Sequence, residues 1–240
     1  MDLIGIALRE AWGLVRSGDA ELWEIVALSL RLAGWTMGLA LLLGLPAGLL
    51  LGFGRFPGRG PLLFLAHVGM GLPPTVVGLW VALLFWRSGP LGELRWIYTP
   101  RAMVVAEVIL TLPIIVALVA TAIESRRAKL LPLLLSLGAT PLQMVWLTLR
   151  EIRLSLLTAV MAGFGRVFSE VGAAMMVGGN IKGETRTMTT AIVLEVSKGQ
   201  FDRALALSFV LLGVSLAITL LLTAVQRAGG GEGEGGGGMG

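Results

Sequence analysis

Arg166 and Glu170 are the residues of this chain whose charges most plainly point to chemistry. They stand in AGFGRVFSEVGAAMMVGGN, residues 162–180, where every other side chain is apolar, small or uncharged. Residues four positions apart lie one helical turn apart, so the guanidinium and the carboxylate can pair. A lone charge inside a membrane segment is costly, so we expect the pair to face the interior of a helix bundle or water.

The pair has two open interpretations. An ionisable residue within a membrane segment marks a functional site by default, which favours a gate on a translocation path. The gate would comprise Arg166, Ser169, Glu170 and Gly172. The alternative is a structural ion pair that locks helix packing. Small residues around the pair would let helices approach closely, including helices from two copies of the chain: Gly163, Gly165, Gly172, Ala173 and Ala174.

The composition places such a segment in a membrane. Of the 240 residues, 55% are hydrophobic and 14% are charged, and the mean hydropathy is +0.85. A soluble domain has about 25% charged residues. Residues 32–53 and 60–86 carry no acidic or basic side chain except His67, and each run is long enough to cross a bilayer core. The chain is therefore predicted to be an all-α polytopic membrane protein.

Several function classes are excluded by what the sequence contains. The net charge is +4, but the basic residues lie mainly in short loops between apolar runs, which argues against nucleic acid as a partner. With one His and no Cys, no metal site is expected. The chain has no G-x-x-x-x-G-K-[ST] motif for nucleotide phosphates. We expect no cofactor and no enzymatic activity in this chain.

Five membrane spans are predicted, at about residues 27–53, 61–86, 102–123, 154–177 and 204–225. The second span contains GLPPT, in which Pro73 and Pro74 remove backbone donors, so the helix must kink or break there. Glu107 lies near the outer end of the third span, where contact with water and a functional role are both compatible with the pattern. No internal repeat or pair of broken helices is evident, which disfavours a self-contained secondary transporter.

The two ends of the chain differ from this transmembrane domain, which we place at residues 25–227. In residues 1–24, apolar side chains recur at helical spacing and predict an interfacial amphipathic helix in contact with membrane lipid. These side chains are Leu3, Ile4, Ala7, Leu8, Trp12 and Val15. The glycine-rich tail, residues 228–240, is expected to be disordered.

The segment 126–150 also differs from the spans. Pro132, Gly138 and Pro141 interrupt its apolar residues, which predicts a short helix, a glycine turn and a second short helix. The second helix would expose four apolar side chains: Leu142, Met144, Val145 and Trp146. Such a helix docks into a groove of a partner protein or lies on lipid. Because basic residues are densest here, we place this loop and the C-terminus in the cytoplasm, and the N-terminus outside.

A longer stretch carries a family resemblance. SLGATPLQMVWLTLREIRLSLLTAVMAGFGRVFSEVGAAMMVGGN, residues 136–180, resembles the cytoplasmic loop and following helix of type I ABC importer permeases. That family has an E-A-A-x3-G-x9-I-x-L-P loop, whose central Gly-Ala pair matches Gly138 and Ala139. Pro132 stands at the position of the motif's Glu, and Arg150-Glu151 at its Leu-Pro.

Other stretches resemble one group within that family. LPPTVVGL, residues 72–79, and SGPLG, residues 88–92, are similar to the permeases for molybdate, sulfate and tungstate. The stretch that begins AGFGRVFSEVG at residue 162 is similar to the tungstate type in particular. The resemblance covers about residues 28–225, which is nearly the whole chain except its two ends.

The resemblance implies a five-span permease core that transports tungstate into a prokaryotic cell across its membrane. It implies a separate ABC ATPase subunit, an extracytoplasmic oxyanion-binding protein and a homodimer. The ATPase would be contacted through Ser136, Gly138, Ala139, Thr140, Pro141 and Leu142. Molybdate and sulfate are alternative substrates, and a secondary anion transporter or a membrane scaffold is an alternative of another class.

Overall fold

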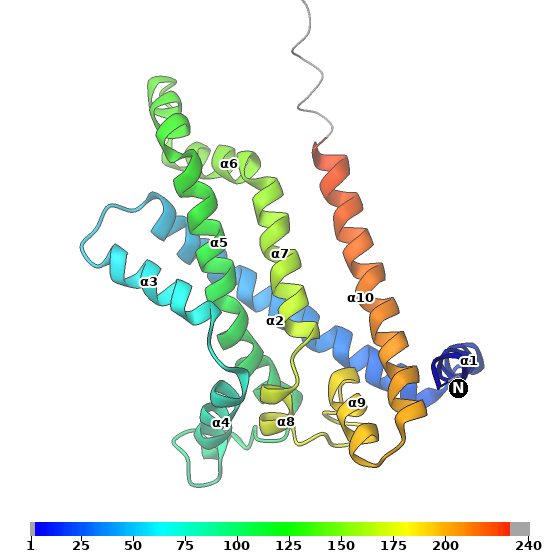
Figure 1. Cartoon of the computed structure of the whole chain (residues 1–240). Helices are drawn as coiled ribbons and strands as arrows, with labels where there is room; N and C mark the ends of the chain where they lie inside the picture. Colours follow the sequence, from blue (N-terminus) through cyan, green and yellow to red (C-terminus); the bar gives the residue numbers. More distant parts are fainter. Residues whose placement is uncertain (1–2, 231–240) are drawn as a thin grey trace, which may run out of the picture.

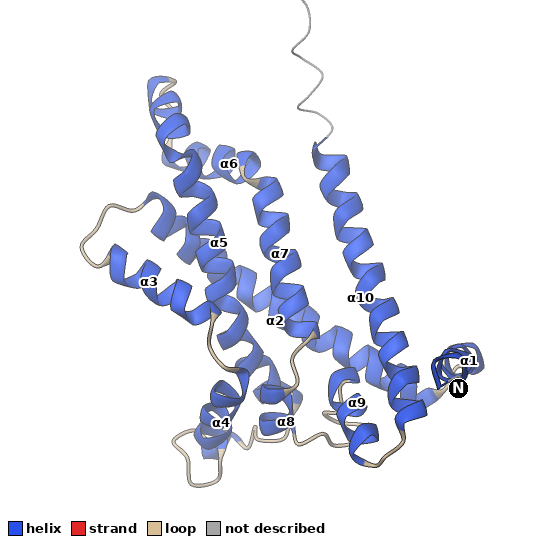
Figure 2. Cartoon of the chain, in the orientation of Figure 1, coloured by secondary structure: helices blue, strands red, loops and turns tan. Residues whose placement is uncertain are grey.

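The computed structural model describes residues 3–230, and the regular structure of that part of the chain is helical (Figures 1 and 2). The helices are α1 (Leu3–Ser17), α2 (Ala20–Phe53), α3 (Arg59–Met70), α4 (Pro74–Phe85), α5 (Pro100–Ser136), α6 (Pro141–Glu151), α7 (Arg153–Phe168), α8 (Gly172–Gly178), α9 (Met188–Ser197) and α10 (Phe201–Gly230). A short 3-10 turn covers Gly92–Leu94 in the α4–α5 loop. The prediction of an all-α chain is confirmed.

Within the described residues, three single helices are long and apolar enough to cross a membrane: α2, α5 and α10. Two further spans arise if each of two bent pairs, α3 with α4 and α7 with α8, counts as one. The total of five agrees with the apolar runs of the sequence.

The first break separates α3 from α4, which meet at an angle of 103°. Pro73 is the residue before the first turn of α4, and Pro74 opens that turn, where the missing backbone N–H of proline costs nothing. The break predicted from GLPPT is confirmed.

The second break is not expected from the sequence. The fourth span is predicted to run on through residue 177, but α7 ends at Phe168 and α8 begins at Gly172, with a bend of 57°. The break covers residues 169–171, so Glu170 is outside both helices. A new helix can begin here because the Glu170 side chain accepts a hydrogen bond from a backbone N–H in its first turn.

The half-helices that follow the two breaks pack against each other. A Cβ built on Gly78 of α4 would lie 2.6 Å from the Cα of Ala173, and one on Gly172 would lie 2.7 Å from Cγ2 of Thr75. The two backbones therefore approach as closely as glycine permits. Paired broken helices thus exist, contrary to the expectation from the sequence, because the second break has no proline to mark it.

A ladder of glycines joins α2 to α5. Gly44, Gly48 and Gly52 recur at every fourth position of α2, and a Cβ on each would lie 2.7 Å from a side chain of α5. The side chains that fill these gaps are Ile115, Val119 and Ile123, also four residues apart. Small residues in one helix accept the branched residues of the other, so the two spans pack closely over this stretch.

The third span continues well beyond its expected end. The first of the two short helices predicted after residue 123 is the last part of α5, which runs unbroken for 37 residues to Ser136. Pro132 lies inside the helix. Its ring frees the carbonyl of residue 128, which is solvent-exposed and can bind water instead. Figure 1 shows α6 lying between the upper part of α5 and the start of α7, with the last turns of α5 projecting beyond it.

The predicted N-terminal helix is present as α1. It packs on α10 through Ala7, Ala11 and Leu14, while Ile4 and Trp12 on its other face are 65% and 68% exposed. Contact of that exposed face with lipid stays a prediction. The expected boundary at residue 24 falls inside α2. The expected tail begins inside α10, which extends to Gly230, and residues 231–240 lie outside the described residues.

Candidate functional site

Glu170 and Arg166 face each other across the second break. The Arg166 Nη2 to Glu170 Oε2 distance is 3.7 Å, and the two side chains are 26% and 3% exposed. The other carboxylate oxygen, Oε1, accepts a hydrogen bond of 2.8 Å from the backbone N–H of Ala173 in the first turn of α8. Glu170 therefore caps α8 as well as pairing with Arg166, which the spacing of the two charges does not reveal.

A second buried carboxylate lies nearby. Glu107 of α5 is 4% exposed, and its Oε2 accepts a hydrogen bond of 2.8 Å from the hydroxyl of Thr36 in α2. A water-exposed position at the end of its span is one of the two alternatives that the sequence allows for Glu107, and that alternative is wrong. Since the partner is 71 positions away, only the packing of α2 on α5 reveals the pair.

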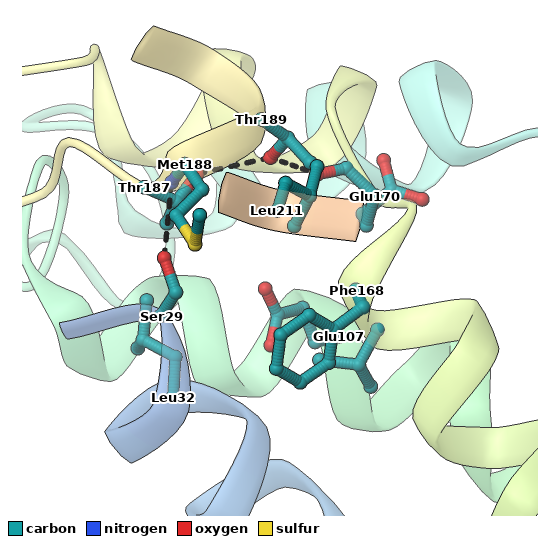
Figure 3. A pocket seen from close by; sticks show the side chains of 10 residues that line it. Ser29, Leu32, Glu107, Phe168, Glu170, Thr187, Met188, Thr189 and Leu211 are labelled. Atoms are coloured by element: carbon teal, nitrogen blue, oxygen red, sulfur yellow. Dashed lines mark hydrogen bonds between the residues drawn. The ribbon is translucent and has the colours of Figure 1, made fainter. Parts of the chain in front are cut away.

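Both carboxylates border a small cavity together with Ser29, Phe168 and Thr189. Figure 3 shows these side chains gathered round it, with the hydrogen bonds from the Met188 N–H to Ser29 and from Thr189 to the Glu170 carbonyl dashed. The cavity volume is about 20 Å³, room for about a single water. In this conformation the cavity is too small to admit a tetrahedral oxyanion.

The other two predicted gate residues, Ser169 and Gly172, contact different parts of the molecule. Ser169 ends α7, is exposed, and donates a hydrogen bond to the Arg166 carbonyl. It borders a groove between α7 and α10 with a volume of about 290 Å³, which Gly165 and Thr219 also line. Gly172 instead packs against Thr75 of α4. The structure therefore brings Arg166, Glu170 and Gly172 to one break and directs Ser169 toward the groove.

Most of the small residues around the Arg166–Glu170 pair are already packed against other parts of the same chain. Gly163 packs against Met37, Gly172 against Thr75, and both Ala173 and Ala174 are buried. Among these small residues, Gly165 alone has open space where a side chain would be. The open side of this segment is therefore the face of α7 that carries Gly165.

The loop between α5 and α6 has the predicted turn. Gly138 has φ of +69°, a conformation that glycine adopts without strain. Ser136 ends α5, and Ala139 donates its backbone N–H to the carbonyl of Leu134, which closes the turn. Thr140 begins α6 with reciprocal hydrogen bonds to Gln143, and Pro141 occupies the first helical position.

This loop presents an apolar surface. Leu142 and Trp146 of α6 are 81% and 58% exposed, and three leucines at the end of α5 are exposed beside them: Leu133, Leu135 and Leu137. The Arg150 guanidinium lies 5.6 Å from the centre of the Trp146 ring, which suits a cation–π contact. Met144 and Val145, expected to be exposed, are partly buried. The exposed patch is therefore narrower along α6 than predicted but extends onto α5.

At the opposite end of the molecule, one carboxylate gathers three cations. Glu21 in the first turn of α2 lies 2.8 Å from Lys182 Nζ, 3.2 Å from an Arg186 nitrogen and 3.7 Å from an Arg203 nitrogen. These contacts join α2, the α8–α9 loop and α10. Gly179 ends α8 with φ of +70°, so GGN at 178–180 acts as a helix C-cap.

The described residues thus combine membrane-spanning helices, two bent helix pairs and an exposed apolar surface at the α5–α6 loop. The chain belongs to the family described as "Binding-protein-dependent transport system inner membrane component", whose model matches residues 44–228. The resemblance found in the sequence is thereby confirmed.

Curated relatives cover most of the chain. A protein of Haloferax volcanii described as "Probable anion ABC transporter permease protein" is 38% identical over 85% of this chain and 91% of its own length. A tungstate uptake permease of Peptoclostridium acidaminophilum is 35% identical over 95% of this chain and 100% of its own. A molybdenum permease of Escherichia coli is 29% identical over 88% of this chain and 97% of its own.

A solved structure shares the fold. The MetNI methionine ABC transporter, in an inward-facing conformation, contains a chain that matches with a TM-score of 0.66 and 19% identity. The match covers 91% of this chain and 96% of that chain. The fold is therefore that of a type I ABC importer permease, as the sequence motif indicated.

Proposed function

We propose that this chain is the permease subunit of an ATP-driven importer for a tetrahedral oxyanion, and that the oxyanion is tungstate. The observation that carries this is the 35% identity to a tungstate uptake permease over 95% of this chain and the whole of that relative. A second tungstate uptake permease, from Campylobacter jejuni, is 37% identical over 68% of the chain. The sulfate permease of Synechococcus elongatus is 30% identical, and the molybdenum permease 29%.

ATP would be hydrolysed in a separate ATPase subunit that docks on the α5–α6 loop. The exposed Leu142 and Trp146 support this, because an apolar helix face with spaced anchors fits a groove on a partner protein. The contact would include Ser136, Gly138, Ala139, Thr140 and Pro141 around them. The loop and the C-terminus would then lie in the cytoplasm of a prokaryotic cell.

The opposite face would receive an extracytoplasmic oxyanion-binding protein, and two copies of the chain would enclose the path. The open side of α7 at Gly165 supports close contact with a second copy. Arg166, Glu170 and Gly172 would form the gate, since they lie at the 57° bend between α7 and α8. Ser169 would face the path from the same break.

Oxyanion uptake by whole cells tests the substrate. A strain that lacks this gene should accumulate tungstate only when the chain is supplied together with its ATPase and binding protein, and excess molybdate or sulfate should compete weakly. The measurement is cell-associated tungsten by mass spectrometry. If molybdate or sulfate abolished tungsten uptake at equal concentration, the substrate assignment would be wrong. Uptake that persisted without the ATPase would contradict the ABC mechanism.

A further inference from the structure

One turn of α5, residues 124–127, contacts three other parts of the molecule. The turn begins directly after Ile123, the last step of the α2–α5 glycine ladder. Glu124 faces α3, Arg126 faces the end of α6, and Arg127 faces the end of α2. We call residues 124–127 the α5 junction.

Two arginines hold the end of α2 at this junction. Arg59, the first residue of α3, donates from Nε to the carbonyl of Leu51 at 2.7 Å, and Arg127 donates from Nη1 to the carbonyl of Gly52 at 3.3 Å. Carbonyls in the last turn of a helix lack partners within the helix, and cations are favoured there. Arg59 also pairs with Glu124 at 3.0 Å, so α2, α3 and α5 are fastened at one place.

The end of α6 reaches the same place by two contacts. Glu151, its last residue, forms an ion pair with Arg126 of α5. Ile152, which connects α6 to α7, is completely buried and packs in the same apolar cluster as Ile123. Ile152 thus anchors the α6–α7 corner in the apolar core, and the ion pair links the last residue of α6 to α5.

We propose that the α5 junction transmits displacement of α6 to α2 and α3, and that Arg126 and Glu151 are the positioning residues that set the direction of α6. This inference rests on the proposed function, in which the ATPase docks on α6. A force on α6 would act on α5 through Glu151 and Arg126. From the next residue, Arg127, it would reach the end of α2, and from Glu124 it would reach α3.

Because the Arg126–Glu151 ion pair is exposed, its role in transmission can be tested separately from any role in folding. The Arg126 and Glu151 side chains are 44% and 49% exposed, and exposed ion pairs contribute little to stability. The buried apolar cluster that contains Ile152 and Ile123 is left intact when the charges change. Removing the pair should therefore alter the direction of α6 while the chain still folds and binds its ATPase.

Charge reversal tests the proposal in the full complex of chain, ATPase and binding protein in proteoliposomes. Arg126→Glu and Glu151→Arg are made singly and together, with Arg55→Glu as the control. Arg55 is an exposed residue of the nearby α2–α3 loop that takes part in none of these contacts. Each single variant should bind the ATPase normally but import roughly fivefold less oxyanion per ATP hydrolysed. The double variant should recover most of the loss, and the control should match the unchanged chain.

A second readout needs no oxyanion. The chain contains no cysteine, so a single Cys in place of Gly60, at the start of α3, can report its movement by its rate of thiol labelling. ATP should change that rate in the unchanged chain and in the double variant but not in either single variant. If ATP changes the labelling rate in this pattern but no oxyanion is imported, the proposed function is wrong, whereas the proposed transmission through the α5 junction is supported.

Three results would overturn the proposal. Single variants with a normal ratio of import to ATP hydrolysis would show that the pair transmits nothing. A double variant as defective as the single ones would show that the two residues do not act through each other. Loss of the ATPase from the single variants would assign the pair to docking instead of transmission.

Discussion

At the scale of single residues, Glu170 joins two functions that a sequence pattern treats separately. One carboxylate oxygen caps α8 through Ala173, and the other faces Arg166. Replacing both Arg166 and Glu170 by apolar residues would therefore remove a helix cap as well as an ion pair. Variants that separate the two effects are needed to decide between a gate and a structural lock.

Glu170→Gln and Glu170→Leu make that separation. Gln keeps an acceptor for the Ala173 N–H but removes the charge opposite Arg166, whereas Leu removes both. We expect the Leu variant to lose about 1 kcal/mol of stability with the cap, and the Gln variant to assemble normally but transport less. Thermal unfolding of the purified complex and uptake per assembled complex are the two measurements. Uptake by the Gln variant equal to that of the unchanged chain would assign the pair to packing alone.

What the sequence reveals at this scale depends on distance along the chain. The pairing of Arg166 with Glu170 follows from a spacing of four residues and could be predicted. The cap on α8 could not be predicted, because it exists only where the helix breaks. The Glu107–Thr36 hydrogen bond joins residues 71 positions apart, so it depends on how α2 packs against α5.

At the scale of elements, the glycine ladder sets the distance between α2 and α5. A Cβ on Gly48 would lie 2.7 Å from both Cβ and Cγ1 of Val119, which are parts of a stiff branched side chain. Gly48→Ala should therefore push the two helices apart and lower stability by about 1–3 kcal/mol, the usual cost of overpacking.

Gly38→Ala is the matched control, because it lies in the same helix with open space around it. That change should leave stability equal or slightly higher, since alanine favours helix more than glycine does. The melting temperature of the detergent-solubilised protein compares the two variants. Equal melting temperatures would show that α2 and α5 are not held by close backbone approach.

The elements themselves were predictable where local signals are strong. Apolar runs indicated the five spans, and Pro73 with Pro74 indicated the first break, because proline acts on its own backbone. The second break and the continuation of α5 past Pro132 were missed. Packing of α8 on α4 maintains the second break. The helix continues through Pro132 because water can bind the carbonyl of residue 128 that the proline frees. Neither condition is visible in a local sequence pattern.

At the scale of the whole molecule, the α5–α6 loop and the paired half-helices α4 and α8 lie at different ends of the long spans. The α5–α6 loop occupies one end, and the α4–α5 loop, next to α8, the other (Figure 1). In the proposed mechanism, ATP acts at the first end while the substrate enters at the second. The central claim is therefore that these two loops face opposite sides of the membrane, with α6 in the cytoplasm.

Single-cysteine labelling in intact cells measures this directly, because the chain has no cysteine of its own. Suitable positions are Ser136 at the end of α5 and Glu93 in the α4–α5 loop, both exposed. Gly92 is unsuitable, since a Cβ there would lie 2.4 Å from the Trp86 carbonyl oxygen. The chain is expressed without its ATPase, which would otherwise cover position 136. With a membrane-impermeant thiol reagent, we expect Glu93→Cys to react in intact cells and Ser136→Cys to react only after the membrane is opened. The reverse pattern would place α6 outside the cell, out of reach of any cytoplasmic ATPase, and would contradict the proposed mechanism.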